Sequence, residues 1–574
     1  MYTDLKNIQV IISLLKQYGI SKMVLSPGTR NVPLVHSVER DKHFECYSMV
    51  DERSAAYFAI GLAEASNEPV CVSCTSSTAT CNYLPAVIEA KRKGIQLVLL
   101  TADRDNYLLQ QGEDQLIPQN KMFGDYTVCD VNLPIVRSDH DLKYCIRKCN
   151  EALIALTANN NIGPVQINFQ VNRIDLCRCA KLPQYRKVEI VKENDFTRMQ
   201  ELKESLLSYN RIMVILGQDF YGKKEKIEQE LDRFYERYNA IIVYEETSNL
   251  HPKNALKTCL IAESMTEREF KQFCPDLVIT IGMHIFSFIK YKLRNNYDGL
   301  THWRVTESED YLDNYDALRA TFRMRPIKFL QYMNDKAPIS NHSYDEKWKK
   351  RISDVKYPEL GFSNYYVVKK FCEKVPDNSL IHLSILNSVR LFNFNSQGNT
   401  VTFSNLGADG IDGCMPTFLG EAEHYNGLAF LVTGDLSYLY ALNTVTSNIK
   451  KNIRILLINN HAGGEFHNNF GVDKIPTLRD FISAGHSTDI RTTVSMGEYE
   501  YLTAKDSSSL ASALELFVGD SECPILLEVF TDADFESNVI KKFYEINQHM
   551  TTKERFIKNT KIVARKILFY LGKR

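Results

Sequence analysis

Short apolar runs alternate with longer stretches of helical spacing along most of the chain. In the first block, four runs read as buried strands: MVLS (23–26), PVCVSCT (69–75), QLVLLTA (96–102) and GPVQINF (163–169). Helical spacing precedes or separates them, in DLKNIQVIISLLKQYGI (4–20), ERSAAYFAIGLAEAS (52–66) and LPAVIEAKRKG (84–94). This alternation predicts a parallel sheet that is covered by helices on both faces.

Two further blocks have the same style of pattern, although no repeat of fixed period joins the blocks. The second block has the strands RIMVILG (211–217), AIIVYEE (240–246) and DLVITIG (276–282). The third has SLIHLSI (379–385), TVTFSN (400–405), LAFLVTGD (428–435), RILLINN (454–460) and PILLEVF (524–530). A charged segment at 336–358 reads as a linker plus a surface helix. We therefore predict an α/β protein with three doubly wound parallel-sheet domains, at 1–185, 190–340 and 355–545, and a basic tail at 546–574.

Length, charge and cysteine usage narrow the class of protein. The 574 residues are too many for one core, and the formal net charge of −1 gives no general attraction to nucleic acid or anionic lipid. No apolar run approaches the roughly 20 residues of a membrane span, and the N-terminal segment lacks a basic-then-apolar signal pattern. Strand alternation puts Cys71 and Cys74 on opposite faces, which favours buried thiols over a metal or redox pair. We expect a cytoplasmic protein with no nucleic-acid partner and no integral membrane span.

Two strands of the third block end in small polar residues, Gly434-Asp435 and Asn459-Asn460. Twenty-three residues separate Asp435 from Asn459, which is enough for one crossover helix, so the strand ends can be neighbours at the ligand-binding edge of the sheet. A carboxylate beside an amide oxygen suits Mg²⁺, which takes phosphate oxygens as further ligands. The glycines of HAGGEF (461–466) would let the backbone approach a phosphate. Strand-end capping is the alternative, but the paired spacing favours a metal–diphosphate site.

Several segments that follow one another along the chain resemble those of a known family. They are LSPGTRNVPL (25–34), VDERSAAYFAIGLAEAS (50–66), CTSSTATCNYLPAVIEA (74–90), LVLLTADR (97–104), GEDQLIPQNKMFGDY (112–126), SNLGADGIDG (404–413) and GDLSYLYALN (434–443). With the Gly-Asp and Asn-Asn fingerprint, the chain resembles the thiamine diphosphate-dependent 2-succinyl-5-enolpyruvyl-6-hydroxy-3-cyclohexene-1-carboxylate synthases of menaquinone synthesis. The resemblance covers about residues 1–540 and is thin in the second block. It implies a pyrimidine-binding domain at 1–185, a central domain at 190–340, a diphosphate-binding domain at 355–545, and thiamine diphosphate and Mg²⁺ as cofactors.

The same resemblance implies roles for the residues of the cofactor site. Glu52 falls on the family's cofactor-activating glutamate, a catalytic residue whose carboxyl hydrogen-bonds the aminopyrimidine ring. Asp435, Asn460 and the backbone carbonyl of Ala462 fall on the metal ligands. The rest of the implied cofactor-binding set is Gly434, Leu436, Gly463 and Ile411, with Ile411 under the cofactor. Taken alone, Glu52 reads as a first-turn helix residue and Ile411 as a core residue.

The substrate pocket is where the chain departs from the family. The positions that match the family's polar substrate residues are Thr29, with Thr in place of the usual Ser, and Arg30, Arg104 and Gln115. A further family stretch is only partly kept in LNSVR (386–390), where Arg390 survives but the spacing shifts. An arginine can bind a carboxylate bidentately, although a surface salt bridge is the alternative reading. Asp114 stands where the family has Asn and Leu406 where it has Arg, and in the second block only Lys290 lies close to an expected arginine. A lost arginine and an added carboxylate weaken binding of a multiply anionic substrate pair, so we expect altered substrates.

Three functions stay open on the sequence. The first is a 2-oxo acid decarboxylase/carboligase that takes a small-molecule 2-oxo acid donor and another acceptor, such as a sugar or other metabolite aldehyde. The second is the synthase proper, which joins 2-oxoglutarate to isochorismate, and the third is a non-catalytic cofactor-binding scaffold, against which the retained Glu52, Asp435 and Asn460 count. The resemblance implies a homodimer or tetramer with active sites shared between chains. The tail at 551–574 reads as a helix packed on the enzyme with a solvated basic face, or as an amphipathic helix on a membrane or partner.

Overall fold

The computed structural model describes most of the chain. It covers residues 1–157, 162–174, 178–218, 224–287, 289–295, 299–357, 361–395, 399–445, 449–468, 472, 475–495, 497–553, 555 and 560. These residues form two compact units, one of Met1–Ile190 with Glu309–Thr321 and one of Val191–Ser308 with Phe322–Arg574. The apolar positions of the expected tail helix, from Phe556 on, lie outside the described residues.

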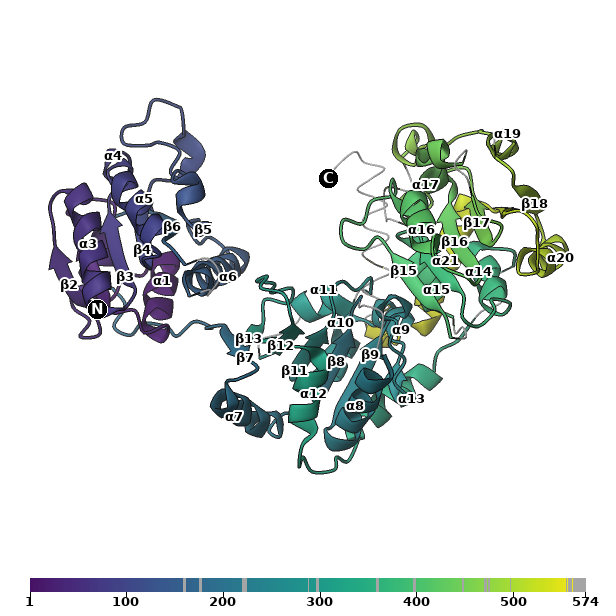
Figure 1. Cartoon of the computed structure of the whole chain (residues 1–574), viewed down its shortest axis with the longest axis horizontal. Coiled ribbons are helices and arrows are strands. Elements are labelled where there is room, and N and C mark those ends of the chain that lie inside the picture. The colour runs from purple at the N-terminus through teal and green to yellow at the C-terminus, as the bar shows by residue number, and fades with distance from the viewer. Residues whose placement is uncertain are drawn as a thin grey trace. The chain divides into compact units, whose positions relative to one another are not determined.

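The first unit is built on a six-stranded sheet, drawn in purple and blue in Figure 1, in which every neighbouring pair is parallel. Its strands are β1 (Lys22–Leu25), β2 (Glu45–Ser48), β3 (Val70–Cys74), β4 (Leu97–Asp103), β5 (Cys129–Leu133) and β6 (Val165–Gln170). Its helices are α1 (Lys6–Gln17), α2 (Val32–Val38), α3 (Glu52–Ser66), α4 (Thr78–Cys81), α5 (Leu84–Lys93) and α6 (Asp139–Leu156). The order of the strands is β2-β1-β3-β4-β6-β5.

Helices cover both faces of this sheet, as the apolar pattern predicts. Cys71 packs in a core cluster with α1 and α6, whereas Cys74 packs in a second cluster with α3 and α5. The two thiols therefore lie on opposite faces of β3, and both are buried. Strands with buried neighbours on both faces need continuous apolar runs, which is why β3, β4 and β6 are legible in the sequence.

The next sheet has seven strands in the order β10-β9-β8-β11-β12-β13-β7, of which the strands from β10 to β12 lie wholly in the second unit and pair in parallel. Its strands are β7 (Glu189–Lys192), β8 (Ile212–Leu216), β9 (Ala240–Tyr244), β10 (Ala255–Leu256), β11 (Leu277–Ile281), β12 (Thr301–Thr306) and β13 (Leu318–Arg323). The helices of this part are α7 (Phe196–Leu206), α8 (Lys224–Arg237), α9 (Cys259–Ser264), α10 (Glu267–Phe273), α11 (Ile289–Asn295), α12 (Pro326–Asn334) and α13 (Ser343–Ser353). The helix expected at the surface is α13, but its Trp348 is fully buried against Phe273, so it is a packed element.

The second unit continues with a six-stranded parallel sheet in the order β15-β14-β16-β17-β19-β18. Its strands are β14 (Leu380–Leu383), β15 (Val401–Ser404), β16 (Ala429–Gly434), β17 (Ile453–Asn459), β18 (Glu500–Ala504) and β19 (Ile525–Phe530). The helices are α14 (Asn364–Cys372), α15 (Asn387–Asn393), α16 (Cys414–Ala422), α17 (Asp435–Tyr440), α18 (Glu465–Asn468), α19 (Ile490–Val494), α20 (Ser507–Phe517) and α21 (Ala533–Asn547). This strand order repeats that of the first sheet, so the two sheets share one topology.

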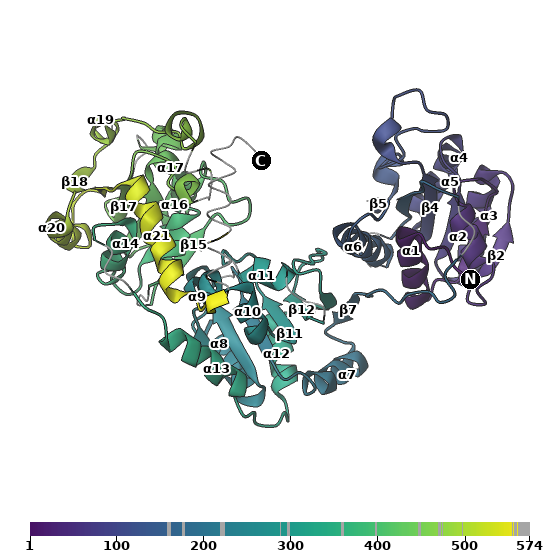
Figure 2. The ribbon, with the colours of Figure 1, turned by 180° about the vertical axis from the view of Figure 1, so that it is seen from behind.

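Different helices cover the two faces of the third sheet. On one face, α14, α15, α20 and α21 bury their apolar side chains against it, and α21 is the yellow helix of Figure 2. On the other face lie α16, α17 and α19. The α/β class with three parallel-sheet domains is confirmed, whereas the exact domain boundaries stay a prediction. Among the described helices, none is long and apolar enough to cross a membrane.

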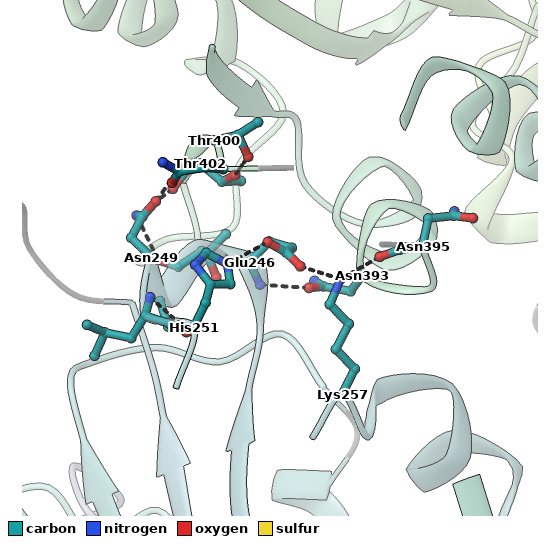
Figure 3. A network of polar contacts seen from close by, with 12 residues as sticks. Glu246, Asn249, His251, Lys257, Asn393, Asn395, Thr400 and Thr402 are labelled. Atoms are coloured by element: carbon teal, nitrogen blue, oxygen red, sulfur yellow. Dashed lines mark hydrogen bonds and ion pairs between the residues drawn. The ribbon is translucent and has the colours of Figure 1, made fainter. Parts of the chain in front are cut away.

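A buried polar network holds the second and third sheets together inside the second unit (Figure 3). The side chain of Asn249, just after β9, accepts from the backbone N–H of Thr402 at 2.7 Å and donates to its carbonyl at 2.9 Å. These bonds satisfy the outer edge of β15, which is an edge strand. Nearby, buried Glu246 pairs with Lys257, and its backbone N–H donates to Asn393 at 2.9 Å. The network therefore fixes the loops at the ends of both sheets.

The buried carboxyl of Glu536, on α21, should make the stability of the fold depend on pH. Its carboxylate accepts the backbone N–H of Asn364 at 2.8 Å, and burial raises its pKa to about 7. The folded chain then keeps a proton that the unfolded chain loses near pH 4.5, so stability falls as pH rises between these values. Glu536→Gln removes the titration, and its stability relative to the natural chain should improve by up to about 3 kcal/mol from pH 5 to pH 8.

Urea unfolding of both proteins at the two pH values measures this difference. Glu515→Gln is the control, because Glu515 makes only an exposed ion pair with Lys374. An effect of Glu536→Gln that is the same at pH 5 and pH 8 would show that the buried carboxyl does not titrate in this range.

Candidate functional site

The third sheet brings the two polar strand ends together. In the parallel pairing of β16 with β17, Gly434 lies opposite Ile458, so Asp435 and Asn459 leave the sheet at the same edge. Asp435 starts α17 directly, without an intervening loop. The two asparagines take different roles. Asn459 is fully buried and donates to Glu528 at 2.6 Å, whereas Asn460 faces a cavity.

The cavity has a volume of about 300 Å³ and lies beyond the carboxyl ends of β14, β16 and β17. The chain reverses its direction across the sheet between β14 and β16, which makes this the switch point where open parallel sheets bind ligands. The residues expected to hold the cofactor and metal in this part of the chain all line it: Ile411, Gly434, Asp435, Leu436, Asn460, Ala462 and Gly463. No lysine, arginine or histidine of the described chain lines the cavity.

The Asp435 carboxylate is held by two partners. Its Oδ1 accepts the backbone N–H of Leu436 at 2.8 Å, and its Oδ2 lies 3.1 Å from Nε2 of His486. The group is only 3% exposed, and burial raises its pKa above the usual range. The ring of His486 stands edge-on to that of His461 at 5.4 Å. Sequence reasoning missed His486 because it lies in a loop 51 residues beyond Asp435 and belongs to no spaced motif.

In the turn after Asn460, the backbone lies close to the Asn460 side chain, and both offer oxygen atoms as ligands. Oδ1 of Asn460 accepts the backbone N–H of Ala462 at 3.1 Å, which orients the side-chain amide. A Cβ on Gly464 would come within 3.0 Å of the Asn460 amide nitrogen, so a side chain there would displace it. The oxygens of Asp435 and Asn460 with a backbone carbonyl form a hard set, which fits Mg²⁺ better than a softer metal. The described residues hold no cluster of three His, Cys, Asp or Glu that could bind a metal.

A residue of α17 holds the backbone of Ile411 in place. Its carbonyl oxygen accepts the hydroxyl of Ser437 at 2.6 Å, and both residues line the cavity. This bond ties the loop before α16 to the helix that starts at Asp435.

Arg390 of α15, expected to meet substrate, is neutralised inside the protein. It does not line the cavity, and it is 4% exposed. Its guanidinium makes two hydrogen bonds to Glu465, at 2.8 and 3.1 Å, and lies 3.7 Å from Glu263. Burial raises the pKa of Glu263 to about 7. Glu465 does line the cavity, so the quoted motif HAGGEF contributes a carboxylate that the sequence reasoning did not weigh.

Leu406, the position at which we expect the chain to lack a family arginine, belongs to the core. It is 9% exposed and packs in the cluster that contains Phe286 and Phe394. An apolar side chain of this size supports that packing and offers nothing to a carboxylate.

In the first unit, Glu52 is the first residue of α3, and Asp51 caps the helix by accepting the N–H of Ser54 at 2.7 Å. Oε2 of Glu52 accepts the side-chain amide of Asn82 at 3.0 Å. Large apolar side chains stand exposed around this helix start: Val50, Tyr57, Phe58 and Leu84. Exposed apolar side chains are typical of interaction surfaces where they form a contiguous patch.

The expected substrate residues of the first unit follow β1 and β4. Arg30 donates its backbone N–H to Thr75 at 3.2 Å, and Arg104 forms an ion pair with Glu113. Burial lowers the pKa of Arg30, and the nearby charge of Arg104 lowers it further, so the two guanidinium groups are neighbours. Gly28 is required at the turn, because a Cβ there would lie 2.4 Å from Cβ of Thr75. Three more residues of this region, Thr29, Asp114 and Gln115, are exposed.

Comparison with known proteins gives consistent matches over nearly the whole chain. The family model "Thiamine pyrophosphate enzyme, N-terminal TPP binding domain" matches residues 6–122. The 2-succinyl-5-enolpyruvyl-6-hydroxy-3-cyclohexene-1-carboxylate synthase of Phocaeicola vulgatus is 32% identical over 559 residues, which is 95% of this chain and 99% of that protein. The proteins of the same name from Bacteroides thetaiotaomicron and Flavobacterium johnsoniae are each 32% identical over 560 residues, with the same coverage.

Among solved structures, benzoylformate decarboxylase from Polynucleobacter necessarius is similar with a TM-score of 0.45. It is 14% identical, and the match covers 93% of this chain and 99% of that one.

Proposed function

Because the chain belongs to the family of thiamine diphosphate-dependent 2-succinyl-5-enolpyruvyl-6-hydroxy-3-cyclohexene-1-carboxylate synthases, we propose that it is a carboligase with altered substrates. It would decarboxylate a small 2-oxo acid and join the remaining fragment to an acceptor with fewer carboxylates than isochorismate. The observation that carries this proposal is that the buried guanidinium of Arg390 is paired with the carboxylates of Glu465 and Glu263.

The cavity of the second unit is the proposed site for the metal and the diphosphate. Asp435, Asn460 and the carbonyl of Ala462 would hold Mg²⁺, and Ile411 would support the cofactor from below. The backbone beside the diphosphate would come from Gly434, Leu436 and Gly463. Thiamine diphosphate, when bound, supplies the carbon nucleophile that attacks a 2-oxo acid and accepts its electrons on decarboxylation.

Glu52 is the proposed acid–base residue. Its carboxyl would hold and exchange a proton at the aminopyrimidine ring of the cofactor. The exposed apolar side chains around Glu52 support a surface that a second copy of the chain covers. A second set of exposed apolar side chains, Tyr440, Phe466 and Phe481, stands in the part of the chain that forms the cavity. We propose a homodimer or tetramer in which Glu52 of one copy serves the cavity of another.

The charges around the cavity indicate what kind of acceptor it would take. The ionisable residues of the described chain that line the cavity are Asp435 and Glu465, and both are acidic. Of the three expected substrate arginines, Arg390 and Arg104 are each paired with a carboxylate, which leaves Arg30 as the one without an ion pair in the described part of the chain. A charge-assisted hydrogen bond to a carboxylate contributes about 1.5–3 kcal/mol, and its loss penalises an anionic substrate most. A donor such as pyruvate and an uncharged aldehyde fit this balance better.

The synthase reaction proper is the second candidate. The 32% identity over 95% of the chain to several proteins of that name favours it. A non-catalytic scaffold has less support, because Glu52, Asp435 and Asn460 are all present and the last two share one cavity.

The substrate proposal predicts a rate difference. Pyruvate with uncharged aldehydes should give a kcat/KM at least about tenfold higher than 2-oxoglutarate with isochorismate, because one lost charged hydrogen bond is enough for that factor. Glu465→Gln should narrow the gap by freeing Arg390, whereas Glu515→Gln, at an exposed ion pair, should leave it unchanged. Steady-state assays of both substrate pairs measure this difference in kcat/KM. Efficient formation of the menaquinone intermediate by the natural chain would contradict the proposal and support the second candidate.

The shared-site proposal predicts complementation. Glu52→Gln and Asp435→Ala chains should each be inactive, for lack of the proton-exchanging carboxyl and of the metal ligand. After subunit exchange, a mixed dimer has one site with both lesions and one with neither, so about a quarter of the natural activity should return. Native mass spectrometry confirms the exchange, and unmixed samples taken through the same procedure are the control. Exchange without any recovered activity would refute shared sites.

A further inference from the structure

A buried side-chain amide in the first unit joins three segments of its chain. Gln119 lies in the segment between β4 and β5, and it is only 1% exposed. Its Oε1 accepts the backbone N–H of Ser77 at 2.6 Å. Its Nε2 donates to the carbonyl of Ala102 at 3.2 Å and to Oδ1 of Asn168 at 3.0 Å. Because a backbone N–H only donates and a carbonyl oxygen only accepts, these partners fix the orientation of the amide.

Asn168 of β6 anchors this amide on the sheet. It is 1% exposed, and its Oδ1 also accepts the hydroxyl of Thr101 at 2.8 Å. Its Nδ2 donates to Oδ2 of Asp103 at 2.9 Å, and Oδ1 of Asp103 accepts the backbone N–H of Arg104 at 2.8 Å. Gln119 is therefore held from the end of β4, directly before the expected substrate residue Arg104.

The turn that Gln119 holds has a strained backbone. Ser77 has φ 70° and ψ −124°, a conformation that is rare for a residue with a side chain, and it is 8% exposed. Such a conformation persists only where the surroundings impose it, and it is frequent at active sites. The carbonyl of Ser77 accepts the backbone N–H of Thr80 at 3.0 Å, at the start of α4. The bond from Gln119 therefore sets where α4 begins.

Helix α4 connects this turn to Glu52. The helix has four residues and is followed by Asn82, whose backbone N–H donates to the carbonyl of Thr78 at 3.1 Å. The side-chain amide of Asn82 donates to Oε2 of Glu52 at 3.0 Å, so it orients the carboxyl at the start of α3. A continuous path of hydrogen bonds and one short helix thus runs from Gln119 to Glu52.

We propose that Gln119 is a positioning residue, which holds the turn at Ser77 so that Asn82 orients the carboxyl of Glu52. A carboxyl exchanges a proton efficiently only within hydrogen-bond distance of its partner, so a displaced turn should slow turnover while substrate binding persists. The consequence for turnover rests on the proposed function. The link from Gln119 to Glu52 does not, because it consists of contacts within the first unit.

Hydrogen exchange of the full-length protein tests the structural link without any cofactor. The Ser77 amide should exchange slowly in the natural chain, and Gln119→Met, which keeps the side-chain length but removes the amide, should speed its exchange about tenfold. Asn150→Leu is the matched control and should leave Ser77 unchanged, because Asn150 is a fully buried amide on α6 that bonds to Tyr18 and Val188. Fast exchange at Ser77 in the natural chain, or equal exchange in Gln119→Met, would overturn the proposal.

Steady-state kinetics tests the effect on Glu52. Gln119→Met should lower kcat about tenfold and keep each KM within about twofold, because a misplaced carboxyl slows proton exchange but leaves the substrate contacts in place. Asn82→Ala, at an exposed side chain, should do the same, and it tests the last step if circular dichroism shows that Gln119→Met is unfolded. Asn150→Leu should change neither constant. A loss of kcat that Asn150→Leu shares, or a rise in KM alone, would contradict a positioning role.

A double variant shows whether the two residues act along one path. If Gln119 acts through Asn82, Gln119→Met combined with Asn82→Ala should lower kcat about tenfold, as each single variant does, rather than about 100-fold. Losses that multiply would overturn the coupling. If no substrate pair turns over with thiamine diphosphate and Mg²⁺, the proposed function fails, while hydrogen exchange at Ser77 still decides whether Gln119 holds the turn.

Discussion

The register of one strand pair is the constraint on which the candidate site depends. Parallel pairing of β16 with β17 sets Gly434 opposite Ile458, and the two chains therefore turn away from the sheet at the same level. Asp435 enters α17 at once, while Asn460 follows a fully buried Asn459 that is anchored on Glu528. A shift by one residue would turn each strand's side chains to the opposite face and separate the carboxylate from the amide. The metal–diphosphate proposal therefore rests on backbone pairing before any side chain is considered.

The second feature that shapes the function is a buried charge that the protein satisfies internally. Arg390 sits among Glu465, Glu263 and the ring of Phe286, and Tyr544 of α21 also bonds to Glu263. Removing one partner from such a buried ion pair commonly lowers folding stability by about 3–5 kcal/mol, so these contacts stabilise the fold. An arginine used in this way cannot also neutralise a substrate carboxylate. Arg390 therefore serves the packing of this chain, and the acceptor is proposed accordingly.

Much of the fold could be predicted from the apolar pattern, and the elements that could not be predicted share a physical reason. The central strands β3, β4, β16 and β17 are buried on both faces and are written as continuous apolar runs. The edge strands β2 and β18 are not buried along their length, so they carry polar residues and leave no such run. Strand β12 was missed for another reason, because its buried positions include His302 and Arg304.

The candidate site divides in the same way. Residues that follow a strand directly, such as Asp435 and Asn460, could be predicted because topology alone places strand ends together. The partners that tune them could not, since His486 reaches Asp435, and Glu465 reaches Arg390, across distances in sequence that no local spacing records. Pairing across elements is a property of packing, which a single sequence does not display.

Calorimetric titration of the full-length protein with thiamine diphosphate, in Mg²⁺ and in EDTA, tests the central claim most directly. The account predicts saturable binding in Mg²⁺ and affinity at least about 100-fold weaker in EDTA, because the diphosphate and Asp435 need the cation between them. Asp435→Ala should weaken binding to a similar degree, whereas Asp520→Ala, at an exposed carboxylate, should not. Equal affinity with and without the metal, or binding that Asp435→Ala leaves unaltered, would contradict the assignment of this cavity.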